Sequence, residues 1–293
     1  MNLFLTVLQI VAPVGLLALS GFIWQKAGFE YRIEFVTRLA MTLATPCLMF
    51  TGLMKAQITP AALTTMLAAA VAAYGVLTLG FWALTAVIGL ERRTYLNPLI
   101  FGNTGNLGLP LALFAFGQAG LGYAIVVFAV AAIWGFTFGV WLVSSGGSPL
   151  RVFREPLVWG ALLGTLFLSQ GWQTPLWLTN SLDLIGQMAI PLMLLTLGVA
   201  VARLKPRHLG RAAWLSLLRA GFCVAIGWTV SQIFGLEPIA AAVLILQIST
   251  PIAVTTYMLA EKYGADSEAV AGLVIVSTLL SVASLPLTLA FLV

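Results

Sequence analysis

The stretch "NTGNLGLPLALF" at residues 103–114 places asparagine, glycine and proline in the middle of an apolar chain. These residues are poor helix formers, and the hydrocarbon core of a membrane offers no water to a broken backbone. Pro110 lacks an N–H group and clashes with the preceding turn, and Gly108 lets the backbone leave helical geometry at low cost. The stretch therefore predicts an interruption inside a membrane-spanning helix.

The composition of the whole chain is that of a membrane protein. Of the 293 residues, 61% are hydrophobic and 8% are charged, whereas soluble domains carry about 25% charged residues. This composition excludes a water-soluble globule and predicts contact with membrane lipid. The net charge of +5 comes from basic residues scattered over short loops, a pattern typical of cytoplasmic loops. Because nucleic-acid binding needs a clustered basic face, no nucleic-acid partner is expected.

Apolar runs separated by charged or Gly/Pro-rich breaks predict ten membrane-spanning helices, each of about 20 residues. The predicted spans are 3–24, 36–54, 61–89, 95–117, 121–143, 156–170, 181–202, 210–234, 238–260 and 269–292. Thirteen basic residues lie in the connecting loops or within three residues of them; 12 of these belong to odd-numbered loops, and Lys55 is the exception. Since cytoplasmic loops are enriched in Lys and Arg, both termini are predicted to lie outside.

The prolines indicate an internal repeat. Five prolines of the first half each have a counterpart 140–146 residues later: Pro13 with Pro156, Pro46 with Pro191, Pro60 with Pro206, Pro98 with Pro238, and Pro110 with Pro251. Each repeat holds five helices, so the second copy enters the membrane from the opposite side. The sequence therefore predicts an all-α membrane protein with an inverted 5+5 repeat, 1–143 and 156–293, joined by a short cytoplasmic linker over 144–155. Inverted repeats are the architecture of many secondary transporters.

The interruption in the fourth span has a counterpart in the ninth, where "QISTPIAV" occupies 247–254. One kinked helix needs only neighbouring helices to satisfy it, but paired interruptions at equivalent repeat positions point to a transporter's binding site. We expect helices four and nine to be discontinuous and to cross near the middle of the membrane. Freed amides at the new helix N-termini attract an anion. The candidate substrate-binding residues are Asn103, Thr104, Asn106, Gly108, Pro110, Gln247, Ser249, Thr250 and Pro251.

Three stretches resemble the auxin efflux carrier family. The pattern "N-T-x-x-x-G-x-P", formed by Asn103, Thr104, Gly108 and Pro110, resembles the first crossover motif of that family. In the second half, "TPIAVTTYMLAEKYGAD" at 250–266 resembles the family's ninth helix and following loop, and "STLLSVASLPLTLAFL" at 277–292 resembles its last helix. The resemblance extends over the whole chain in helix count and order.

The resemblance implies a ten-helix fold related to that of the bile-acid:sodium symporters. Helices 1, 2, 6 and 7 would form a scaffold that also makes a homodimer, and helices 3–5 and 8–10 would form a moving transport domain. Asn103 matches the crossover asparagine that contacts the substrate carboxylate, and Pro110 and Pro251 match the crossover prolines.

The sequence departs from the plant carriers of that family in two places. The long regulatory loop between the repeats is reduced to about 144–156, and the second helix, "TRLAMTLATPCLMFTGLM" at 37–54, lacks their acidic residue. These departures indicate a bacterial-type member, and bacterial relatives are usually assigned to malate, malonate or related organic acids.

Two charged residues inside predicted spans are further candidates, because ionisable residues within membrane spans mark function by default. Arg219 lies in the eighth span and either counters the charge of an anionic substrate or extends toward the cytoplasm along the helix. Asp183 begins the seventh span and is either a proton or cation carrier or an N-terminal acid that complements the helix dipole.

These patterns predict a secondary transporter for small organic anions, with auxin-like or malate- and malonate-like carboxylates as candidates. Transport would follow an elevator mechanism, driven by protons, by sodium or by neither. The alternative is a sodium-coupled organic-anion symporter of the bile-acid type. An enzyme is not expected, because no predicted span contains a pair of acids and His208 is the single histidine. No cofactor or metal is expected, and the predicted location is the bacterial inner membrane.

Overall fold

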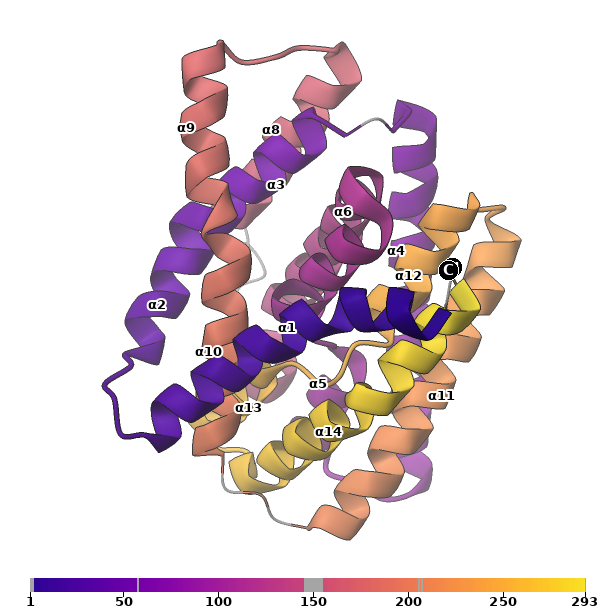
Figure 1. Ribbon diagram of the computed structural model, residues 1–293. Helices are drawn as coiled ribbons and strands as arrows, with labels where there is room; N and C mark the ends of the chain where they lie inside the picture. The colour runs from indigo at the N-terminus through magenta and orange to yellow at the C-terminus, as the bar shows by residue number, and fades with distance from the viewer. Residues whose placement is uncertain (1–2, 57, 145–154, 205, 207, 293) are drawn as a thin grey trace.

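The computed structural model describes residues 3–56, 58–144, 155–204, 206 and 208–292. Apart from an isolated bridge between Gly102 and Ile252, the regular secondary structure of these residues is entirely helical (Figure 1). The predicted linker over 144–155 falls outside the described residues except for its two end positions.

The first half of the described chain contains the predicted spans one to five. The first and third spans are the single helices α1 (Leu3–Lys26) and α4 (Pro60–Val87). The second span is continuous through α2 (Ile33–Leu39), the π-helical segment η1 (Ala40–Ala44) and α3 (Thr45–Met54). The fourth and fifth spans consist of α5 (Arg92–Ile100), the π-helical segment η2 (Thr104–Gly108), α6 (Leu109–Trp134), the π-helical segment η3 (Gly135–Gly139) and α7 (Val140–Ser144).

The second half contains the remaining predicted spans. The sixth is α8 (Pro156–Gln170), and the seventh divides at Met188 into α9 (Leu176–Gln187) and α10 (Ala189–Arg203). The eighth is α11 (Leu209–Ile233), and the tenth is α14 (Ser267–Leu292). The ninth is interrupted, as predicted, and consists of α12 (Pro238–Ile248) and α13 (Val254–Tyr263).

Local chemistry explains where several helices begin and end. At the start of α4, the Thr59 hydroxyl accepts the Ala62 N–H at 3.2 Å, and Pro60 follows as the first helical residue. Gly171 and Gly264 end α8 and α13 in the left-handed conformation that suits glycine. Inside α6, Gly117 has a φ of 63° and breaks the helix. The break lies between the predicted fourth and fifth spans.

By length and composition, seven helical segments among the described residues are able to cross a membrane: Leu8–Lys26, Ile33–Met54, Pro60–Val87, Thr104–Ser144, Leu176–Arg203, Leu209–Ile233 and Ser267–Phe291. The helices α8 and α12 are apolar but shorter. Large apolar side chains face outward, for example Leu79 at 73% exposed and Leu184 at 70%. Contact with lipid tolerates such a surface, whereas water opposes it. The chain is therefore an all-helical, multi-pass membrane protein.

Most of the packing falls within two groups of helices. The first group consists of α1, α2, η1, α3, α8, α9 and α10, in which α1 lies along α10 and α3 lies along α8 and α9. Glycines allow these close approaches: a Cβ on Gly198 of α10 would lie 2.7 Å from the Phe22 nitrogen of α1. A Cβ on Gly164 of α8 would lie 2.9 Å from the Phe50 carbonyl oxygen of α3. Small residues serve this purpose between membrane helices.

The second group consists of α4, α5, η2, α6, α7 and α11 to α14. Within it α11 packs against α12 and α14, α12 packs against α6, and α4 packs against α5 and α6. Its interior holds large side chains with no exposed surface, including Tyr74, Leu77 and Phe81 of α4. In Figure 1 most of the first group lies to the left, and α4, α11 and α12 lie to the right. Both interrupted helices belong to the second group.

Candidate functional site at the crossing of two interrupted helices

The two predicted interruptions are present and lie against each other. The helix stops between α5 and η2 and again between α12 and α13. The extended residues form a short antiparallel ladder, in which the Asn103 N–H donates to the Pro251 carbonyl at 2.7 Å. The Ala253 N–H donates to the Phe101 carbonyl at 3.2 Å. Each broken backbone therefore satisfies the other, which removes the penalty that unpaired groups would suffer inside a membrane.

The first interruption lies slightly before the proline that was expected to cause it. The backbone leaves helical geometry at Phe101, while Pro110 lies in the first turn of α6. Pro46 and Pro110 each follow the last residue of a π-helical segment by two positions. Since proline cannot donate to the carbonyl four residues earlier and its ring clashes with that carbonyl, the preceding turn widens. Pro110 therefore shapes η2, and Gly102 permits the break.

Gly102 lies where the two extended segments cross, and the crossing leaves no room for a side chain at this position. A Cβ at this position would lie 2.9 Å from the Nη2 atom of Arg219 and 3.0 Å from the Thr250 carbonyl oxygen. The first distance is shorter than real Cβ contacts, and the second is tighter than most of them, so a side chain here would force its neighbours to shift. The absence of a side chain thus allows the two extended segments to approach within hydrogen-bonding distance.

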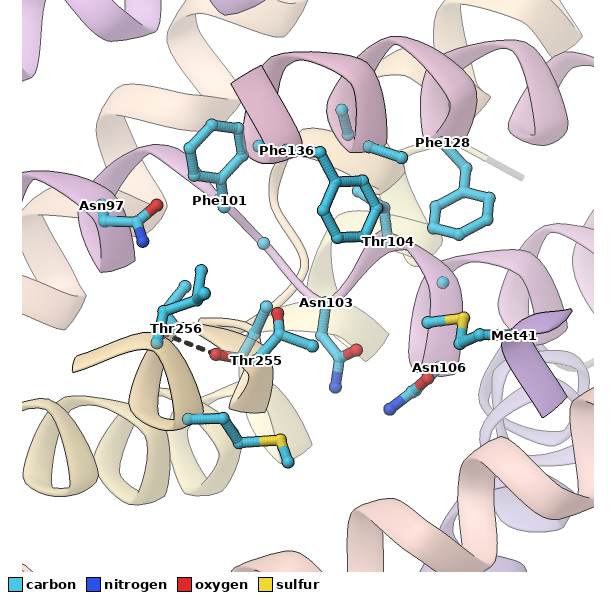
Figure 2. Close-up of a pocket in the computed structure, with 18 of the residues that line it drawn as sticks. Met41, Asn97, Phe101, Asn103, Thr104, Asn106, Phe128, Phe136, Thr255 and Thr256 are labelled. Carbon is cyan, nitrogen blue, oxygen red and sulfur yellow. Dashed lines mark hydrogen bonds between the residues drawn. The ribbon is translucent and has the colours of Figure 1, made fainter. Parts of the chain in front are cut away.

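A cavity of about 270 Å³ opens beside the crossing. Figure 2 shows that the side chains of Asn103, Asn106 and Thr255 lie together on one side, with the rings of Phe101 and Phe136 on the other. The Thr256 hydroxyl also lines the cavity but donates to the Ala253 carbonyl at 2.6 Å, which is the dashed bond of Figure 2. The cavity therefore has a polar side and an apolar side.

Two helix N-termini border the polar side. The helix that resumes at Thr104 forms its first internal bonds from Leu107 and Gly108, both to the Asn103 carbonyl. The amides that precede them in the first turn have no acceptor within the helix. The helix α13 begins in the same way at Val254, and its first-turn residue Thr255 lines the cavity. A helix N-terminus carries about half a positive charge, so both N-termini favour an anion in the cavity.

Two buried asparagine amides add hydrogen-bond donors to the cavity. Asn97 is 2% exposed and Asn103 is 5% exposed, and both line it. The Nδ2 atom of each has no hydrogen-bond partner among the described residues. A buried unsatisfied polar group costs about 1–3 kcal/mol, so these donors favour an occupant that carries acceptor oxygens.

All three π-helical segments of the described residues border the same cavity. Met41 comes from η1, Thr104 and Asn106 come from η2, and Gly135 and Phe136 come from η3. Single turns of π-helix inside α-helices occur frequently at functional sites. Their convergence on one cavity supports its assignment as the candidate site.

The nine predicted substrate-binding residues separate into two sets. Asn103, Thr104 and Asn106 line the cavity. The others are not among its lining residues and build the crossing instead: Gly108, Pro110, Gln247, Ser249, Thr250 and Pro251. In this second set the Gln247 amide packs against Gly108, and the Thr250 hydroxyl donates to the Gln247 carbonyl at 2.7 Å.

The two predicted charged residues also lie outside the cavity lining. Asp183 of α9 forms an ion pair with Lys55, which follows α3, and the two side chains are 25% and 46% exposed. Arg219 of α11 is 2% exposed and donates to main-chain carbonyls at the crossing. Of the two alternatives for Arg219, extension toward the cytoplasm is therefore wrong, because its guanidinium is held inside the protein by these acceptors.

Several residues that line the cavity were not predicted from the sequence: Met41, Asn97, Phe101, Phe128, Phe136, Thr255, Thr256 and Lys262. Asn97 and Thr255 could have been found, since they lie within six residues of the interruptions. The phenylalanines carried no signal, because aromatic residues are common in every span. Lys262 of α13 is exposed, and it is the single charged residue among the described lining residues.

Three relatives are similar to this chain. An uncharacterized transporter of Methanothermobacter thermautotrophicus is 26% identical over 95% of this chain and 96% of its own length. An uncharacterized transporter of Methanocaldococcus jannaschii is 27% identical over 62% of each chain. A Rhizobium meliloti protein, whose name proposes that it transports malonate, is 24% identical over 63% of this chain and 62% of its own.

The family-level comparison agrees with the helical fold and with these relatives. The model of the family described as membrane transport protein matches residues 140–289, which is more than half of the chain. This chain therefore belongs to the membrane transport protein family, the family of the auxin efflux carriers.

Proposed function

We propose that this protein is a secondary transporter for small organic anions and that the anion binds in the cavity at the crossing. The observation that carries the proposal is the convergence of two helix N-termini and two unpartnered amide donors on one cavity. All of these groups are hydrogen-bond donors. A carboxylate is acceptor-only when ionised and matches such a set.

We propose further that the chain crosses the membrane ten times as two inverted repeats. Seven segments qualify by length and composition alone. The Gly117 break divides Thr104–Ser144 into two crossings, α8 adds one, and α12 with α13 adds another. Ten crossings place both termini on the same side of the membrane, and the enrichment of Lys and Arg in the odd-numbered loops makes that side the outside. The proposed location is the bacterial inner membrane.

The elevator mechanism is proposed from the grouping of the helices. Both interrupted helices lie in the second group, and a small second cavity of about 30 Å³ lies between the groups. Its lining comes from α2, η1 and α10 of the first group and from η2 and α13 of the second. The second group would slide against the first and carry the cavity from one side of the membrane to the other. The first group would form the scaffold of a homodimer.

The cavity's two sides bear on the substrate class. The polar side, at Asn103 and Asn106, suits a carboxylate, and the apolar side, at Phe101, Phe128 and Phe136, suits hydrocarbon. The name of the Rhizobium meliloti relative favours malonate. We therefore propose carboxylates, with malonate and phenylacetate as the first probes of a short diacid and of an acid with an aromatic body.

The test is binding and uptake by the purified protein. Wild-type protein in liposomes should accumulate labelled malonate or phenylacetate, and imposed proton and sodium gradients would show whether either ion drives uptake. Asn103→Ala should weaken carboxylate binding about tenfold or more, because a hydrogen bond to a charged group contributes about 1.5–3 kcal/mol. Asn180→Ala is the matched control, since Asn180 is exposed on α9 and outside the cavity lining. Absence of binding by wild type, or unchanged affinity in Asn103→Ala, would reject the proposal.

A further inference from the structure

Arg219 donates hydrogen bonds to carbonyls at the ends of two interrupted helices. Its Nε donates to the Leu99 carbonyl at 2.9 Å, its Nη1 to the Thr250 carbonyl at 2.7 Å and its Nη2 to the Ile248 carbonyl at 3.5 Å. Leu99 is the penultimate residue of α5, Ile248 is the last residue of α12, and Thr250 follows two positions later. One buried guanidinium thus caps the C-terminal ends of both half-helices that stop at the crossing.

The electrostatics of the crossing depend on this cap. Two helix N-termini and two helix C-termini meet there, with about half a charge on each, positive and negative respectively. Without a further charge at the crossing, the partial charges of the four helix ends would nearly cancel. The guanidinium of an arginine carries a full positive charge, and that of Arg219 lies at the two negative helix ends. The charges of the two N-terminal ends are then left uncompensated.

Arg219 lies directly behind the wall of the cavity. Gly102 lines the cavity, and a Cβ on Gly102 would lie 2.9 Å from the Nη2 atom of Arg219. Arg219 itself is not among the lining residues and is 2% exposed. Its charge therefore reaches an occupant through a low-dielectric wall one residue thick, where Coulomb interactions are stronger than in water.

We propose that Arg219 is a positioning residue that makes the crossing net positive and so gives the cavity its preference for anions, without contacting the substrate. The inference rests on the proposed function, because it assumes that a carboxylate binds at the crossing. It differs from a purely structural role in one respect: the charge of Arg219, and not only its hydrogen bonds, should set the preference for a carboxylate over an uncharged analogue.

Arg93 provides a matched control. This arginine of α5 also caps helix ends, and its Nη2 donates to the Val143 and Tyr263 carbonyls at 3.0 Å each. These acceptors lie at the ends of α7 and α13 that are remote from the crossing. Substitution of Arg93 should lower stability, but it should leave the charge preference of the cavity unchanged.

The experiment measures a ratio of affinities. Dissociation constants are determined for malonate and its diamide, and for phenylacetate and phenylacetamide, with wild type, Arg219→Gln, Arg219→Lys and Arg93→Gln. Arg219→Gln should lower the carboxylate-to-amide affinity ratio at least tenfold, Arg219→Lys should retain most of the ratio, and Arg93→Gln should leave it unchanged. An unchanged ratio in folded Arg219→Gln would overturn the inference.

A second pair of variants keeps Arg219 and its hydrogen bonds in place. Cys223 is fully buried one helical turn after Arg219, and residues four apart on a helix are neighbours. Cys223→Asp should neutralise the guanidinium and lower the ratio, whereas the near-isosteric Cys223→Asn should not. Equal ratios in these two variants would overturn the inference even if Arg219→Gln does not fold. A wild-type protein that binds no carboxylate would instead contradict the proposed function.

Discussion

At the residue scale, the cavity is built from donors that the protein leaves unsatisfied. The amide nitrogens of Asn97 and Asn103 are buried without partners, and they come from the two sides of the same break. Such groups lower the stability of the empty protein. We propose that an occupant of the cavity accepts their hydrogen bonds.

This explanation predicts opposite effects of one substitution on stability and on binding. Asn97→Leu replaces a buried unsatisfied amide with an apolar side chain of similar shape. The thermal midpoint of the ligand-free protein should rise, with a gain of about 1 kcal/mol in stability. Carboxylate affinity should fall, and a thermal-shift titration with malonate and phenylacetate measures both quantities on one sample. A fall in both would show that Asn97 packs in the structure and is not a donor held for a ligand.

The sequence predicted some single residues of the cavity and not others. Asn103, Thr104 and Asn106 were identified because polar residues beside a helix break are rare in an apolar chain. Gln247 and Thr250 have the same sequence signal, but their side chains lie in the crossing, where the Gln247 amide packs against Gly108 and the Thr250 hydroxyl donates to the Gln247 carbonyl at 2.7 Å. Which way a polar side chain points depends on the rotation of each half-helix, and a sequence pattern does not fix that rotation.

At the scale of elements, the crossing depends on the close approach of two extended segments. Gly102→Ala would place a methyl group against the Arg219 guanidinium and the Thr250 carbonyl. Such overpacking costs about 1–3 kcal/mol, and the pairing of the ladder would weaken. We expect a lower thermal midpoint together with weaker carboxylate binding, measured by thermal unfolding and titration of the purified protein.

The control for this substitution is a glycine with open space around it. A Cβ on Gly75 of α4 would meet no atom within 4 Å. Alanine is a better helix former than glycine by about 1 kcal/mol, so Gly75→Ala should leave binding unchanged and stability equal or higher. If the two variants behave alike, the tight approach at Gly102 does not matter for the crossing.

The extent of several helices was predictable, although α9 begins at Leu176 and not at 181 as predicted. The contact between the interruptions was only partly predictable. Apolar runs placed α8 and α14 to within two residues, because burial in lipid imposes a continuous apolar pattern. The proline spacing indicated that the two breaks correspond. The hydrogen bond from Asn103 to Pro251 joins residues 148 positions apart, and no local pattern specifies such a pair. The three π-helical segments were also missed: η1 is as apolar as an ordinary membrane helix, and the polar η2 was interpreted only as an interruption.

At the scale of the whole molecule, the proposed mechanism requires the two helix groups to move past each other. The small cavity between them is lined by Thr37 of α2 and Met193 of α10 from the first group, and by Val254 of α13 from the second. Val254 does not line the larger cavity. A covalent link from Thr37 to Val254 would therefore tie the groups together and leave the candidate binding residues in place.

We expect this link to stop transport while binding persists. In a background of Cys47→Ala and Cys223→Ala, which removes both natural cysteines, the pair Thr37→Cys and Val254→Cys is oxidised to a disulfide or alkylated at both thiols by a short bifunctional thiol-reactive reagent. Uptake into liposomes should fall to background and should recover when an oxidised bridge is reduced. Carboxylate affinity should change little, because a ligand binds each fixed conformation according to that conformation's own affinity.

The pair Thr37→Cys and Met193→Cys is the control, since both residues line the same small cavity but belong to the first group. Linking them restrains α2 against α10 without joining the groups, so transport should continue. If the link across the groups leaves uptake at the wild-type rate, the second group does not slide as a body. Transport would then require a smaller movement within that group, at the crossing itself, where the Asn103–Pro251 ladder is the element able to open.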